Sequence, residues 1–141
     1  QHIVIGARLL DRMQQPKGRR RANAIADWGI SIVSAQPIAD TQSGQRWYPL
    51  AALQLVDLPA EHFVFEAAVL IAASREKHLG VVSVPIASRY HSGFRRSHFS
   101  PLRDVTRIAL YTIGRLFHYG DMRASYRRSR DKPVIIGDTP T

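Results

Sequence analysis

The sequence of 141 residues contains no cysteine, which excludes disulfide bonds and thiolate metal sites. No apolar stretch approaches eighteen residues, so we expect no segment that spans a bilayer. Acidic residues are scarce: 11 Asp and Glu stand against 20 Lys and Arg, which gives a formal net charge of +9. This excess favours a polyanionic partner, such as nucleic acid, anionic lipid headgroups or a phosphorylated substrate, although a basic surface can also serve solubility alone.

The hydrophobic pattern predicts one α/β domain. Hydrophobic residues make up 45% of the chain, enough to build a core. Short β-branched or aromatic runs predict strands at residues 2–5, 45–48 and 81–86. Apolar residues at three-to-four spacing predict helices at residues 19–35, 63–77 and 104–117, with a shorter helix after Pro49. This order is typical of an α/β fold with a few-stranded mixed sheet and three main helices.

Two further expectations concern the organisation of the chain. We expect the domain to cover residues 1–120 and residues 121–141, which are rich in arginine, to form a basic and flexible tail. Trp28 and Trp47 are expected in the core, because large aromatic side chains bury much apolar surface.

A basic loop is expected between the third strand and the helix that follows it. Residues 88–99 hold three arginines and two histidines among small and aromatic residues. A cationic loop between a strand end and a helix start suits an anion such as a phosphate or diphosphate. His91 and His98 have no carboxylates at ligand spacing, so we predict no metal site there.

Six short motifs, in order, resemble the C-terminal half of family 2 glycosyltransferases of the dolichyl-phosphate mannosyltransferase type. They are Ile-Val-Ile-Gly-Ala-Arg (residues 3–8), a basic helix start with Asn23, Asp-Thr-Gln-Ser-Gly-Gln-Arg (40–46), Phe-Glu (65–66), Val-Pro-Ile (84–86), and Arg-Tyr with Ser-His-Phe (89–90 and 97–99). The resemblance covers about residues 2–118. It implies a partial GT-A (Rossmann-like) fold whose N-terminal nucleotide-binding half is missing from this chain.

The resemblance also implies a reaction and its participants. A nucleotide-sugar donor would give its sugar to a polyprenyl-phosphate-type acceptor, with a divalent metal, Mg or Mn, held by an Asp-x-Asp segment in the full-length enzyme. No Asp-x-Asp segment occurs in this sequence, so the chain lacks the segment that would hold the metal and is expected to be inactive alone. A phosphate acceptor is already anionic near neutral pH, so it needs positioning and charge screening more than a general base.

The resemblance assigns roles to eight residues. Arg8 and one arginine of the 19–21 run, Arg20 or Arg21 foremost, would face the acceptor phosphate, and Arg89 with Ser97 would hold the donor diphosphate. Asp40 and Arg46 would lie beside the sugar, and Glu66 matches the family's first acidic position, although Ala68 stands where many relatives carry a second acid. The catalytic residues in this assignment are Asp40 and Arg89.

Each of these residues also has a structural explanation. Arg8 could form a surface ion pair with Asp11, and Asp40 with Ser43 could cap a turn. Glu66 near a helix start is favoured by the helix dipole alone, whereas three arginines at a helix start are not. Solvated charge, phosphate binding and contact with a membrane surface all remain open for the arginine run.

The location and partners of the protein depend on the same charges. We expect a cytoplasmic protein associated peripherally with the inner face of the membrane, bound to anionic lipid through residues 103–132. The alternative is a basic module that binds nucleic acid or another anion without catalysis, with Tyr90, Phe94, Phe99 and Tyr126 stacking on bases. Against it, the arginines are spread over separate loops and no recognised nucleic-acid motif occurs. Self-association is also open, because an incomplete sheet exposes an edge.

Overall fold

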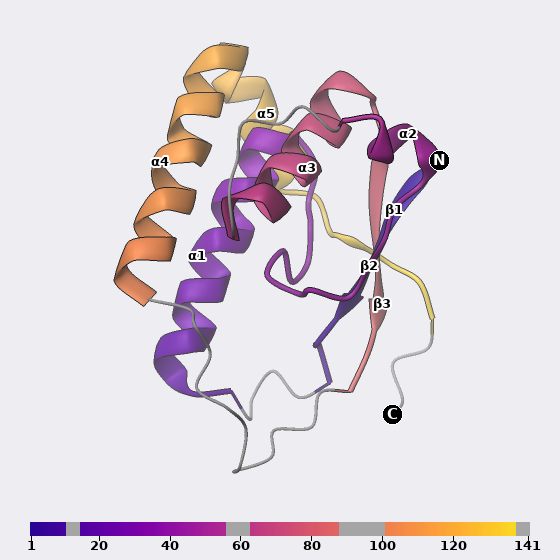
Figure 1. The fold of residues 1–141 in the computed structure, drawn as a ribbon, viewed down its shortest axis with the longest axis vertical. Coiled ribbons are helices and arrows are strands. Elements are labelled where there is room, and N and C mark those ends of the chain that lie inside the picture. Colours follow the sequence, from indigo (N-terminus) through magenta and orange to yellow (C-terminus); the bar gives the residue numbers. More distant parts are fainter. Residues whose placement is uncertain (11–14, 56–62, 88–100, 138–141) are drawn as a thin grey trace.

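The computed structural model describes residues 1–10, 15–55, 63–87 and 101–137. A four-stranded mixed sheet lies against a set of helices (Figure 1). In chain order the elements are β1 (His2–Ala7), α1 (Lys17–Ser34), β2 (Arg46–Trp47), α2 (Leu50–Leu53), α3 (Phe63–Glu76), β3 (Gly80–Pro85), α4 (Pro101–Tyr119), α5 (Met122–Ser129) and β4 (Val134–Ile135). The predicted α/β class with a few-stranded mixed sheet is confirmed.

The strand order is β2-β1-β3-β4. β1 is parallel to β3, β3 is parallel to β4, and β2 is antiparallel to β1. Because β1 and β3 are parallel, their carboxyl ends meet at one end of the sheet, and the start of α1 lies at the same end of the molecule (Figure 1). Ligand sites of open α/β sheets lie at such an end.

The core lies between the sheet and the helices. Alternate residues of β1, Ile3 and Ile5, are fully buried, as a strand with period two requires. In α3 every residue from Ala67 to Ala73 is buried, because this helix packs under α1 and α4 rather than on the surface. The run of small residues in α3 lets its neighbours approach closely.

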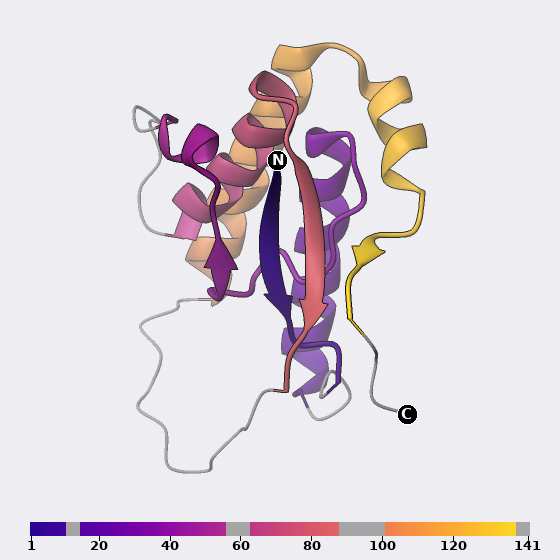
Figure 2. The ribbon, with the colours of Figure 1, turned by 90° about the vertical axis from the view of Figure 1, so that its right-hand side faces the viewer.

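The other face of the sheet carries an apolar row that crosses all four strands. Trp47 pairs with Val4, Val4 with Val82, and Val82 with Val134. Within the described ranges no helix lies on this face, which looks toward the viewer in Figure 2. Parallel strands are usually covered on both faces, so this half-covered sheet is unusual.

The structure corrects two expectations. Residues 121–137 are not a tail without regular structure: α5 packs on α1, and β4 extends the sheet beside β3. The non-local contacts that hold them, described below, leave no local pattern in the sequence. Trp28 and Trp47 are not in the core either, since they are 64% and 61% exposed. Finally, no helix of the described ranges is long and apolar enough to cross a membrane.

Candidate functional site

The candidate site begins where β1 ends. The backbone N–H of Arg8 donates to Oδ2 of Asp40 (2.8 Å), and its guanidinium binds the same carboxylate with both ends of the fork, Nε to Oδ2 (2.8 Å) and Nη2 to Oδ1 (2.7 Å). The Asp40 side chain is 10% exposed and that of Arg8 is 22% exposed. A two-pronged, mostly buried pair of this kind fixes the orientation of both groups.

Asp40 stands in an unusual backbone conformation. Its φ is +52°, in the left-handed region, which aspartate tolerates better than most residues. This turn brings the carboxylate back onto the end of β1, 32 residues earlier in the chain. Among the described residues, Asp40 is therefore a partner of Arg8. Asp11, the partner considered from the sequence, lies outside the described residues.

The loop of residues 40–46 is tied to α1 and to β1. Thr41 donates from its backbone N–H and its hydroxyl to one oxygen of Asp27 in α1, both at 2.7 Å. The Ser43 hydroxyl donates to the carbonyl of Gly6 in β1, and the Gly6 N–H donates to the carbonyl of Gln45. These contacts hold the loop rigidly across the end of the sheet.

Arg46 anchors the same loop to the start of α3. Its side chain is 2% exposed. It donates to the carbonyl oxygens of Thr41, Ser43 and Glu66, to the Tyr48 hydroxyl at 3.3 Å and to the Glu66 carboxylate at 3.5 Å. A guanidinium has five N–H donors, and five bonds occupy them. Arg46 is thus a structural residue of the loop, and it has no donor left for a substrate.

The remaining predicted residues lie at different places. Glu66 is partly exposed beside Arg46, so one of its carboxylate oxygens can reach solvent. Arg21 is exposed on the first turns of α1, at the carboxyl end of β1 and β3, and Arg20 is half-buried there. Arg89 and Ser97 lie outside the described residues. The structure therefore brings together Arg8, Asp40, Arg46 and Glu66 and leaves the diphosphate-binding pair untested.

Two residues of the site, Asp27 and Tyr48, did not stand out in the sequence. Asp27 acts through Thr41, which is distant in the chain, and Tyr48 accepts a hydrogen bond from its near neighbour Arg46. Gly6, whose carbonyl accepts from Ser43, lies within the first motif. Asp27 follows the first two turns of an otherwise basic helix, which was the one available signal. Asp27 holds Thr41 and thereby positions Asp40, the residue before it.

The described ranges contain no cluster of three or more His, Asp and Glu side chains that could hold a metal ion. The two carboxylates of the site, Asp40 and Glu66, are engaged by Arg8 and Arg46. These residues do not fit a divalent metal, because each carboxylate is paired with a guanidinium that brings positive charge beside it, even though one oxygen of Glu66 reaches solvent. Any metal of the reaction would need ligands from elsewhere.

Comparisons with known proteins give no neighbour for this arrangement. No family model matches the chain, and neither a curated protein nor a solved structure is significantly similar to it.

Proposed function

We propose that this chain is the acceptor-side part of a glycosyltransferase with a GT-A-like fold, which transfers a sugar from a nucleotide-sugar donor to a polyprenyl-phosphate-type acceptor. The observation that carries the proposal is the convergence of Arg8, Asp40, Arg46 and Glu66 at the carboxyl end of β1. These residues belong to three motifs separated by up to 58 positions in the sequence. A resemblance by chance would not be expected to bring them to one site.

The roles within the proposal follow the contacts. The phosphate oxygen of the acceptor attacks the anomeric carbon, the bond from that carbon to the diphosphate breaks, and the nucleotide leaves with the bonding electrons. Asp40, held by Arg8, is suited to accept a hydrogen bond from a sugar hydroxyl at a fixed position. Arg46 positions the loop, which revises the substrate-binding role expected from the sequence. Arg20 or Arg21 faces the acceptor phosphate, and Arg89 with Ser97 remains assigned to the donor diphosphate.

The uncovered sheet face supports the view that the chain works with a further layer of polypeptide. In the apolar row of Val4, Trp47, Val82 and Val134, the edge residues Trp47 and Val134 are more than half exposed, whereas Val4 is partly buried and Val82 is 5% exposed. A nucleotide-binding half, which would bring the donor and its metal, would need such a surface to pack on. The proposal places the complete enzyme in the cytoplasm, peripherally at the inner face of the membrane.

Binding of a short prenyl phosphate tests the proposal without the donor. We expect farnesyl phosphate to bind the chain and farnesol to bind far more weakly, measured by NMR titration. Arg21→Gln should weaken farnesyl phosphate binding about tenfold, because it removes a charge-assisted contact. Arg123→Gln, an equally exposed arginine on α5, is the matched control and should leave binding unchanged.

Two results would contradict the proposal. Equal affinity for farnesyl phosphate and farnesol would remove the phosphate from recognition. Tight binding of an unrelated oligonucleotide with a steep salt dependence, in the absence of binding to farnesyl phosphate, would favour the basic nucleic-acid-binding module instead.

A further inference from the structure

Large apolar side chains are exposed together on three neighbouring helices. We call this surface the outer helical face, and it comprises Ile25 and Trp28 of α1, Leu110, Ile113 and Phe117 of α4, and Met122 and Tyr126 of α5. Within each helix the spacing is three or four residues, so each set lies on one side of its helix. In α4 the buried residues Ile108 and Thr112 lie on the opposite side, so this helix has two separate apolar faces.

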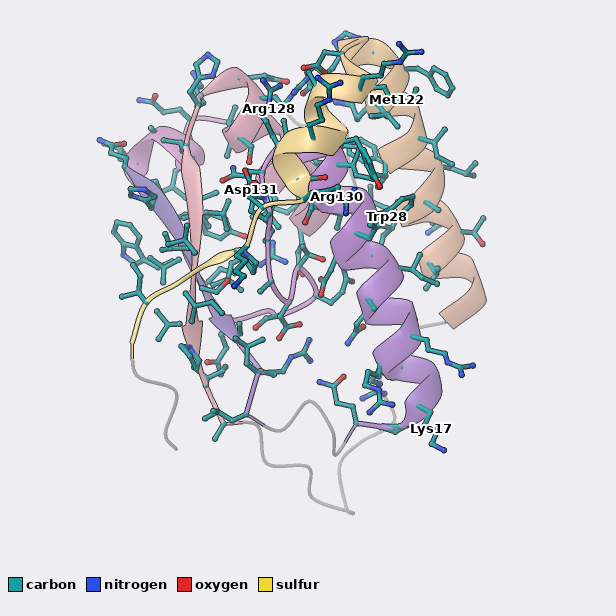
Figure 3. All side chains as sticks on the ribbon, turned by 180° about the vertical axis from the view of Figure 1, so that it is seen from behind. Lys17, Trp28, Met122, Arg128, Arg130 and Asp131 are labelled. Carbon is teal, nitrogen blue, oxygen red and sulfur yellow. The ribbon has the colours of Figure 1, made fainter. Side chains whose placement is uncertain are left out.

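The three helices form one continuous surface. α1 and α4 approach closely at Gly29, where an added Cβ would lie 3.6 Å from a methyl group of Thr112. α1 and α5 share an open groove of about 340 Å³, whose walls include Trp28, Tyr126 and Arg130. In Figure 3 Trp28 lies on the near side of α1, with α4 on one side of it and α5 above. Aromatic side chains from two helices therefore meet at the middle of this face.

Positive charge surrounds the apolar side chains. The exposed cations in the described part of the same three helices are Lys17, Arg19, Arg21, Arg107, Arg123, Arg127 and Arg128, the last of them paired with Asp121. Of the described acids on or beside these helices, Asp27 binds Thr41 and Asp121 binds Arg75, while Asp131 is exposed at the wall of the groove. Trp and Tyr beside Lys and Arg are the combination that binds the headgroup region of anionic bilayers.

We infer that the outer helical face docks on an anionic lipid bilayer, with Trp28, Phe117 and Tyr126 at headgroup depth. A second copy of the chain fits the face less well, because it would bring the same excess of positive charge against the same cations. A bilayer with acidic headgroups offers the complementary charge and accepts apolar side chains without a shaped pocket.

The inference rests on the proposed function for one step, the presence of a lipid acceptor. On α1 the outward residues Lys17, Arg21, Ile25 and Trp28 follow one another at three-to-four spacing, from the candidate site to the middle of the outer helical face. The cations Lys17 and Arg21 match the phosphate of a lipid, and the apolar residues Ile25 and Trp28 match its hydrocarbon chain. The docked face would thus present the acceptor phosphate to the start of α1.

The two tryptophans allow a direct test. Trp28 lies on the outer helical face and Trp47 on the strand β2, on the other side of the molecule. In Trp47→Phe, which leaves Trp28 as the reporter, vesicles with 30% phosphatidylglycerol should shift the emission to the blue, and brominated lipid should quench it. In Trp28→Phe the emission of Trp47 should not change. Vesicles of phosphatidylcholine alone should bind much more weakly, and salt should weaken binding to the anionic vesicles.

A matched pair of variants separates the face from general hydrophobicity. Phe117 is 71% exposed on α4 and Leu50 is 72% exposed on α2. Phe117→Ser should weaken vesicle partitioning about tenfold, whereas Leu50→Ser should not change it. Circular dichroism checks that both variants are folded, which their exposure favours.

Three outcomes would overturn the inference. One is equal binding to neutral and anionic vesicles, and another is quenching of Trp47 rather than Trp28. The third is a vesicle-independent dimer, detected by light scattering, that Phe117→Ser dissociates, because the face would then bind a second copy. The vesicles contain no prenyl phosphate, so their failure to bind would leave the glycosyltransferase proposal standing, and failure of farnesyl phosphate to bind would leave vesicle docking standing.

Discussion

Replacement of Arg46 by methionine tests the structural role that its five hydrogen bonds imply. Methionine fills a similar space but donates no hydrogen bond, so the carbonyls of Thr41, Ser43 and Glu66 each lose a partner. An unpaired buried carbonyl costs about 1–3 kcal/mol, and we take the low end because the loop lies near solvent. Three such losses sum to about 3 kcal/mol. The ion pair with Glu66 adds little, because it is 3.5 Å long and the Glu66 side chain is 42% exposed.

The measurement is urea unfolding monitored by circular dichroism. The dependence of the free energy of unfolding on urea concentration is compared between variants. A loss of about 3 kcal/mol should also lower the melting temperature by roughly 10 °C. Arg46→Lys should lose less, about 1–2 kcal/mol, because an ammonium has three donors and no planar fork. Arg123→Met is the control, since Arg123 is exposed on α5 and should change stability by no more than about 0.5 kcal/mol. If Arg46→Met lost less than about 1 kcal/mol, the loop would not depend on these bonds and the reasoning would be wrong.

Three further predictions concern other parts of the fold. A hydrogen bond from Arg75, aided by one from Ser125, lowers the pKa of Asp121 to about 2. The stability that the ionised Asp121 contributes is therefore complete above pH 4 and is lost as the pH falls toward 2. Asp121→Asn should cost about 1 kcal/mol at pH 7, allowing for the 36% exposure of the side chain, and should flatten the acid limb of the pH–stability curve. The guanidinium carbons of Arg75 and Arg115 lie 4.4 and 4.8 Å from the centroid of the Tyr119 ring. Tyr119→Phe loses the hydroxyl contacts with Arg115 and Glu76 but keeps the ring, so Tyr119→Leu should lose about 1–2 kcal/mol more than Tyr119→Phe in urea unfolding. Equal losses would exclude the cation–π contribution. Gly6→Ala should lose about 1–2 kcal/mol of stability, because the new Cβ would lie 3.1 Å from Ile86 and 3.2 Å from Gln45. Gly114→Ala should gain up to about 1 kcal/mol, because nothing lies within 4 Å of its new Cβ on an exposed helix. Thermal unfolding of both variants checks that the two changes in stability have opposite signs.

Local pattern predicts the elements whose stability comes from burial against the sheet. The helices at residues 17–34, 63–76 and 101–119 agree with the predicted ranges to within three residues, as do the main strands. Each carries an apolar period that the core then uses. Hence the α/β class could be inferred before any contact was known.

The two elements that the sequence analysis missed are held by non-local polar contacts. α5 has a low apolar content, and its start is fixed because Asp121 accepts hydrogen bonds from Arg75 of α3 and from Ser125. β4 has only two residues and exists because β3 offers a free edge. Neither cause can be read from a window of neighbouring residues.

The sequence named Arg8, Asp40, Arg46 and Glu66 as candidate residues, but it did not indicate how they pair. The resemblance placed Arg8 at the acceptor phosphate and Asp40 with Arg46 beside the sugar, whereas the pairing of Arg8 with Asp40 depends on the left-handed turn at Asp40. Likewise, the role of Arg46 changed from ligand to anchor once its donors were counted. A charged residue in a motif can serve the substrate or the loop, and only its contacts distinguish the two.

The error at Trp28 has a general physical reason. A period of 3.6 residues shows which side chains share a face of a helix, but not which layer, if any, covers that face. α1 has one apolar side toward the sheet, with Ile30 and Val33 buried, and a second toward the outside, with Ile25 and Trp28 exposed. Only the first is needed for folding. Trp28 lies on the second side, so it adds no stability by burial in the isolated fold. Beside α4 and α5 it extends the apolar face that we assign to the bilayer.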